Sequence, residues 1–161
     1  MEEKNKIFEN IFNMQSREVR KTFLMFLYIL LGVSTFIIGR AVRDALFLSR
    51  YNISSLPYMY VLVALVVSLS ALIYSRYIKN FRTSSVIIFI DLLFACLFIL
   101  FWLAIRFKVT DYIYPALYVF VEIAGSLIIV PFWTFANEIF TSREAKRLFG
   151  IIGAGGVLAN V

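Results

Sequence analysis

Histidine is absent from the 161 residues, and cysteine occurs once, at Cys96. The lack of histidine removes the commonest metal ligand and the commonest general base. A single cysteine can form neither an intramolecular disulfide nor a cysteine zinc site. No Walker loop, HExxH motif or nucleophile triad is found in the sequence. We therefore predict that the chain is not an enzyme and needs no cofactor or metal ion.

Charged residues are also scarce, at 16%, whereas 61% of the residues are hydrophobic and 17% are aromatic. An average soluble domain is about 45–50% apolar and about 25% charged. A soluble domain of this size could not bury so much apolar surface. The net charge of +6 comes from short clusters between long apolar runs, so no basic face remains for nucleic acid. The composition predicts an integral membrane protein whose partner is the lipid bilayer.

Four apolar stretches are long enough to cross about 30 Å of hydrocarbon as helices. They cover residues 22–48, 56–75, 86–107 and 112–140. A fifth stretch, residues 148–161, would rise only about 21 Å as a helix, which is too short to span. We therefore expect an all-α membrane domain over residues 22–161, cut inside its fifth helix.

Basic residues predict the orientation. Eleven of the sixteen Lys and Arg residues lie in residues 1–21, 76–82 and 141–147, which alternating spans place on one side. The positive-inside rule assigns that side to the cytoplasm, so we expect the N-terminus and a 141–147 loop there, in a multi-pass protein of the cell (inner) membrane. Residues 1–21 repeat apolar side chains at helical spacing, which predicts an amphipathic segment on the inner leaflet or, alternatively, a frayed tail.

Glu122 lies ten residues into the fourth predicted span, about 15 Å deep by helical rise. Its charged form is costly there unless it faces a cavity or a cation. One interpretation is a cavity residue that meets a substrate or carries a proton; the other is a protonated Glu satisfied by a neighbouring helix. From depth alone, Arg43 and Arg40 of the first span are close enough to pair with it.

Arg40, Arg43 and Asp44 share one side of a helix, and apolar residues flank them on both sides. We predict a single long helix that continues past these charges, with the charged face turned from lipid. The alternative is a snorkelling cluster at the interface. Arginine's planar fork suits bidentate binding of phosphate or carboxylate.

Pro115, Gly125 and Pro131 predict interruptions of the fourth helix. The segment FGIIGAGG, residues 149–156, does not fit a dinucleotide loop, because no strand precedes it and position 158 is Leu. The small residues here, such as Gly155 and Ala159, are better explained by close packing between helices.

Two segments resemble the ATP/ADP translocase family, the nucleotide transporters of plastids and intracellular bacteria within the major facilitator superfamily. They are GRAVRDALFLS at 39–49 and FWTFANEIFTSREAKRLFGIIGAGG at 132–156. The resemblance implies a divergent bacterial member with two six-helix halves, of which this chain would supply the first four helices and the start of the fifth. Arg replaces the family's Lys at position 43, and no acidic residue directly precedes EAKR.

The resemblance also implies the site and the activity. Arg43 takes the place of the important first-helix Lys and Glu122 that of the acidic residue of the fourth helix; Arg40, Asp44, Asn137 and Glu138 match as well. The implied activity is exchange of ATP for ADP, or of a related anionic metabolite, by alternating access, completed by the remaining helices of the full-length transporter. The alternatives are a proton-coupled carrier of another solute on the same fold and a membrane anchor or sensor module.

Overall fold

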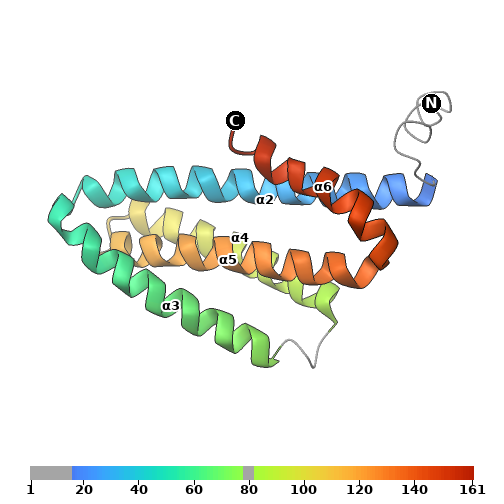
Figure 1. The fold of residues 1–161 in the computed structure, drawn as a ribbon. Coiled ribbons are helices and arrows are strands. Elements are labelled where there is room, and N and C mark those ends of the chain that lie inside the picture. The colour runs from blue at the N-terminus through green and yellow to red at the C-terminus, as the bar shows by residue number, and fades with distance from the viewer. Residues whose placement is uncertain (1–15, 78–81) are drawn as a thin grey trace. The chain divides into compact units, whose positions relative to one another are not determined.

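The computed structural model describes residues 16–77 and 82–161 (Figure 1). Its elements follow in the order α2 (Ser16–Leu48), the 3-10 helix η1 (Ile53–Ser55), α3 (Leu56–Tyr77), α4 (Thr83–Arg106), α5 (Ile113–Ile139) and α6 (Ser142–Leu158). No strand occurs in these two ranges, which confirms the predicted all-α fold. The predicted amphipathic segment falls mostly on residues 1–15, outside the described residues, while residues 16–21 already belong to α2.

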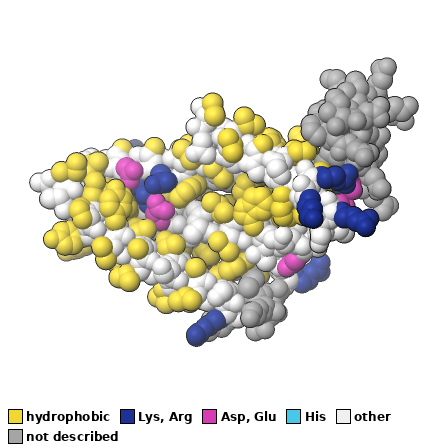
Figure 2. Space-filling view, in the orientation of Figure 1, with side chains coloured by type: hydrophobic (Ala, Val, Ile, Leu, Met, Phe, Trp, Pro, Cys, Tyr) yellow, Lys and Arg dark blue, Asp and Glu magenta, His cyan; other side chains and the backbone are white. Residues whose placement is uncertain are grey.

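Four helices are long and apolar enough to cross a membrane: Glu18–Leu48, Ile53–Arg76, Thr83–Arg106 and Ile113–Ile139. They correspond to the four spans expected from the sequence. Large hydrophobic side chains are exposed along them, and in the view of Figure 2 charged side chains form only small groups among hydrophobic ones. Such surfaces suit lipid or further helices, and the chain is a multi-pass membrane protein.

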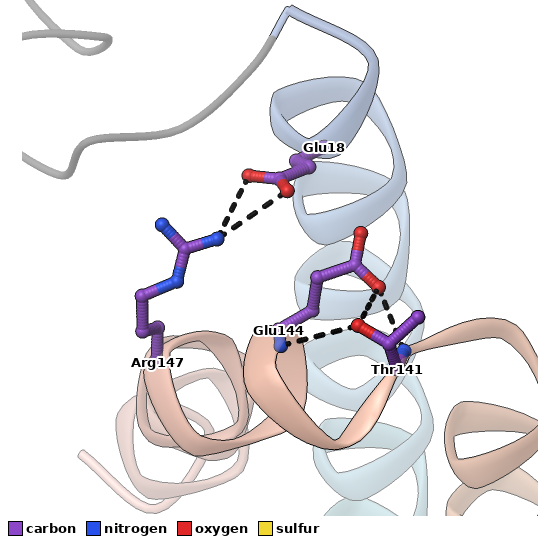
Figure 3. A network of polar contacts seen from close by, with 4 residues as sticks. All are labelled: Glu18, Thr141, Glu144 and Arg147. Atoms are coloured by element: carbon purple, nitrogen blue, oxygen red, sulfur yellow. Dashed lines mark hydrogen bonds and ion pairs between the residues drawn. The ribbon is translucent and has the colours of Figure 1, made fainter.

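Helix α2 continues through Arg40, Arg43 and Asp44 to Leu48, as predicted. Helix α6, by contrast, begins at Ser142 and not at Leu148, so the expected 141–147 loop is wrong. A capping box causes the early start: the Thr141 hydroxyl accepts a hydrogen bond from the Glu144 backbone N–H, and the Glu144 carboxylate accepts one from the Thr141 N–H at 2.7 Å (Figure 3).

The predicted interruptions of α5 are also wrong, because the helix is continuous from Ile113 to Ile139. Pro115 lies in the first turn, where a backbone N–H has no helical acceptor in any case. Gly125 and Pro131 are both buried inside the helix. Gly125 serves helix packing, as its contacts described below show.

The described residues form two compact units. The terminal unit contains residues 16–34 and 136–161, and the central unit contains residues 35–135 apart from 78–81. In the terminal unit, Leu148 and Ile152 of α6 are fully buried. A Cβ atom on Gly155, one turn later, would lie 2.7 Å from the Phe26 carbonyl oxygen of α2. The backbones of the two helices therefore pack directly against each other at this point.

The central unit has two clusters of buried hydrophobic residues. One joins Phe94 of α4 to Leu117, Phe120, Val121 and Ala124 of α5. The other joins Phe47 of α2, Met59 of α3 and Tyr118 of α5. Both clusters include residues of α5, so α5 is the central helix of this unit. The packing of its apolar face therefore determines the direction in which its polar side chains point.

Candidate functional site

Arg43 is the most deeply buried charged residue described, with 2% of its surface exposed. Its Nη2 atom lies 2.6 Å from Oε1 of Glu122 on α5. Its Nη1 atom donates a hydrogen bond of 3.0 Å to the backbone carbonyl of Tyr118, also on α5. A carbonyl oxygen has two lone pairs, so it can accept this bond beside its helical one. The ion pair that depth along the two helices allowed is therefore present in the structure.

A second arginine reaches the same carboxylate. Nε of Arg40 lies 3.5 Å from Oε1 of Glu122. The Arg40 side chain is 54% exposed, whereas that of Glu122 is 21% exposed. Glu122 therefore faces two cations, one buried and one accessible.

Tyr118 is the site residue that the sequence analysis missed. Its ring centroid lies 4.0 Å from Cζ of Arg43, a cation–π contact, and its side chain is 1% exposed. Phe47 packs edge-on against the same ring. The signal was present in the sequence, because Tyr118 precedes Glu122 by four residues and so shares its helix face.

Two glycines allow α2 and α5 to approach closely at the ion pair. A Cβ on Gly39, one turn before Arg43, would lie 3.2 Å from Cγ1 of Val121. A Cβ on Gly125, one turn after Glu122, would lie only 2.3 Å from ring atoms of Phe36. Small residues at such crossings let helix backbones come together in membranes. Arg43 can thereby reach a backbone carbonyl of the neighbouring helix.

The spacing of four residues would allow Asp44 to pair with Arg40, but the carboxylate of Asp44 lies next to Arg43 instead. Its Oδ1 atom is 3.3 Å from Nε of Arg43, but neither atom has a hydrogen-bond partner in the described structure. Adjacent residues on a helix do not face each other, which explains the poor alignment. The Nε–H of Arg43 is thus a buried donor that no acceptor satisfies.

This arrangement leaves one edge of the guanidinium partly available. Nε and Nη2 form the edge that grips planar or tetrahedral anions with two parallel N–H groups. Here Nη2 is bound by Glu122, and Nε has only the misaligned Asp44. An anion with two oxygens could bind both positions if Glu122 moved away.

Asn137 and Glu138 belong to the other compact unit. They lie in the last turn of α5, in the terminal unit, and both are exposed. Each takes part in interactions within the structure. Four of the six predicted residues thus come together, and a substrate-binding role for any of the six stays a prediction.

Part of the chain matches the model of a known family. Residues 102–161 match the family model described as TLC ATP/ADP transporter. The matched part contains Glu122, Asn137 and Glu138, but not Arg40, Arg43 or Asp44. No curated protein and no solved structure matches the chain. The match supports, at the level of the family, a nucleotide transporter.

Proposed function

We propose that this chain is part of a carrier that exchanges nucleotides, of the ATP/ADP type, or a related anionic metabolite by alternating access. The carrier would be a divergent bacterial member of the ATP/ADP translocase family within the major facilitator superfamily. It would lie in the inner membrane with the N-terminus in the cytoplasm, and the helices of the full-length transporter would complete its cavity. The family match over residues 102–161 supports the substrate class.

The observation that carries the proposal is the buried pair of Arg43 and Glu122. Ionisable residues within a membrane span are costly and are kept there mainly for binding or translocation. Two arginines converge on one glutamate, so these three side chains carry a net charge of +1. Asp44 beside Arg43 brings the group of four to a net charge of zero, so an arriving anion must displace a carboxylate to bind the two cations.

In the proposed mechanism, Glu122 holds Arg43 while no substrate is bound. A phosphate group that arrives from the cavity displaces the carboxylate from Nη2 and also satisfies the free Nε–H. Arg40 then neutralises the released Glu122. The substrate thus replaces one ion pair by another, so the buried guanidinium is never left without a partner, which would cost several kcal/mol.

Uptake of labelled ATP, ADP and phosphate by liposomes containing the full-length protein tests this function. Arg43→Ala should lower exchange about 100-fold or more, as expected for loss of a buried charged partner. Arg43→Lys should keep part of the activity, because Lys retains the charge but loses the fork. Arg106→Ala, at the exposed end of α4, is the matched control and should exchange normally. Normal exchange by the Arg43→Ala protein at normal expression would refute the proposed role.

The same assay addresses the other functions. Uptake of an uncharged or cationic solute that follows a proton gradient, without nucleotide exchange, would indicate a proton-coupled carrier. A protein that takes up none of these solutes but joins a soluble signalling domain would indicate an anchor or sensor module.

A further inference from the structure

The central unit holds an apolar groove that the proposed transport site does not use. The groove has a volume of about 360 Å³ and is lined by residues of α2, α4 and α5, from Thr35 to Leu46 on α2 and from Phe98 to Ile105 on α4. Arg43 and Glu122 are not among its lining residues. From Thr35 to Leu46 the helix advances eleven steps, which correspond to about 16 Å by helical rise. That length matches one leaflet, about half of the 30 Å hydrocarbon core.

A polar pocket adjoins this groove. The pocket measures about 150 Å³ and is lined by Arg50, Lys108, Thr110 and Asp111, together with Ile105, Ile113 and Tyr114. Ile105 lines both the groove and the pocket, so the apolar and polar spaces meet at the last turn of α4. The pocket lies at the helix ends, where a lipid headgroup would be found.

The charges of the pocket favour an anion. Arg50 and Lys108 face a single carboxylate, Asp111, which is 76% exposed and only 3.9 Å from Nη1 of Arg50. No hydrogen bond or ion pair within the described ranges engages the Lys108 ammonium group. The Thr110 hydroxyl oxygen accepts a bond from the Tyr112 N–H, so its own hydrogen is free to be donated. The pocket therefore offers two cations and a hydroxyl donor.

The backbone at Lys108 gives a second, independent indication. Its φ is 50°, and no other non-glycine residue in the described part of the chain has a positive φ. The N–H groups of Lys108 and Val109 bond back to the carbonyls of Ile105 and Ala104, which closes the helix in a Schellman motif. Glycine is the usual residue at this position, and another L-residue costs roughly 1–2 kcal/mol. Such strain is typical of positions where the side chain has a function.

We propose that this groove and pocket bind an anionic phospholipid. One acyl chain lies in the groove along α2 and α4, and the phosphate is held by Arg50 and Lys108, with the Thr110 hydroxyl as a further donor. Basic pockets between membrane helices bind anionic headgroups in the same way. A zwitterionic lipid has no net charge to match the positive pocket, so the anionic headgroup is preferred.

Native mass spectrometry of the full-length protein in neutral detergent tests the proposal. Phosphatidylglycerol, phosphatidylcholine and inorganic phosphate are added separately, and the bound fraction is measured. Phosphatidylglycerol should be retained in preference to the other two. Arg50→Gln should weaken its retention about five-fold, the effect expected for one basic residue at an anionic lipid surface. Arg106→Gln, a neighbouring cation outside the pocket lining, is the matched control and should retain the lipid normally.

Two further variants separate the parts of the site. Lys108→Gly should weaken lipid retention and, because it relieves the strained φ, raise the unfolding temperature without lipid. A purely structural lysine would not give this opposite pair of effects. Val42→Trp, which fills the groove from its exposed side, should weaken phosphatidylglycerol retention and leave phosphate unaffected.

Three results would overturn the proposal. Equal retention of phosphatidylcholine with no effect of Arg50→Gln would show that charge is not recognised. Binding of inorganic phosphate as strong as that of the lipid, with no effect of Val42→Trp, would identify a free-phosphate site. Absence of any retained lipid would show that another helix of the protein fills the groove.

Discussion

The chain contains two glutamate–arginine pairs of the same chemistry in different surroundings. In the central unit, Glu122 and Arg43 are 2.6 Å apart, and their side chains are 21% and 3% exposed. In the terminal unit, Glu18 and Arg147 are 3.3 Å apart, and their side chains are 11% and 42% exposed (Figure 3). In each pair one partner belongs to α2, but only the arginine of the central unit is almost completely buried.

This difference in burial changes what each pair can do. A partly exposed arginine is solvated by water when its partner leaves, so such pairs contribute about 0–1 kcal/mol. A buried arginine has no such replacement, and its partner must be exchanged for another anion. The same two types of side chain therefore join two helices in one unit and, in the proposed mechanism, form a substrate switch in the other.

The largest expected effect comes from making the same substitution in both pairs. Glu122→Leu should lower the free energy of unfolding by about 3–5 kcal/mol, because Arg43 keeps a buried charge without its carboxylate. Glu18→Leu should lower it by about 1 kcal/mol or less, since Arg147 can turn to solvent. Unfolding of both full-length variants in mixed detergent micelles checks this. Equal losses would mean that burial does not distinguish the pairs.

An intermediate effect is expected where α6 packs on α2 in the terminal unit. Gly155→Ala places a Cβ 2.7 Å from the Phe26 carbonyl oxygen, and this backbone atom cannot move aside easily. We expect a loss of about 1–3 kcal/mol in the free energy of unfolding, the usual cost of overpacking. Gly153→Ala is the control: nothing lies within 4 Å of its Cβ, so it should gain about 0.5–1 kcal/mol in helix propensity.

This comparison would show whether packing or the ion pair fixes α6. A Gly155→Ala loss larger than that of Glu18→Leu means that helix contact dominates in the terminal unit. The opposite order would assign the main role to the Glu18–Arg147 pair.

The smallest effect concerns pH at the start of α6. Hydrogen bonds from the Thr141 backbone N–H and hydroxyl lower the pKa of Glu144 below its ordinary value of 4.5. A carboxyl with a lowered pKa stabilises the fold at pH values above its ordinary pKa, and this contribution disappears as the pH falls through the lowered value. The capping box should therefore weaken only in acid.

NMR titration of the Glu144 side-chain carbon measures this pKa directly. Thr141→Val removes the hydroxyl and keeps the backbone N–H, so it should raise the pKa part of the way toward 4.5. If the pKa of Glu144 returned fully to 4.5 in the Thr141→Val protein, the backbone N–H could not be the main cause of the lowered pKa.

The sequence predicted the helices well where hydrophobicity alone determines them. The fourth span was expected at residues 112–140, and α5 covers Ile113–Ile139. The continuation of α2 past Arg43 was predicted because apolar residues lie on both sides of the charges. Depth along the two helices also showed that Arg43 could reach Glu122, since helical rise is the same in every sequence.

Other features of the structure differ from what the sequence predicted. Residues 141–147 were interpreted as a loop because they are charged, although Thr141 and Glu144 have the spacing of a capping box. Gly125 and Pro131 were interpreted as helix breaks, but Gly125 instead makes room for Phe36. Tyr118 was missed because its contact with Arg43 depends on how the two helices face each other. The rotation of each helix about its own axis is determined by packing against its neighbours, so it cannot be read from the sequence of one helix.

The central claim is that Glu122 holds Arg43 and releases it to an anionic substrate. Nucleotide exchange by the Glu122→Gln protein in liposomes, measured across a range of pH, tests this claim most directly. Gln keeps the size of the side chain but cannot form the ion pair, so we predict impaired exchange at every pH. Exchange that survives in Glu122→Gln and no longer varies with pH would contradict the account, because Glu122 would then carry a proton and not control Arg43.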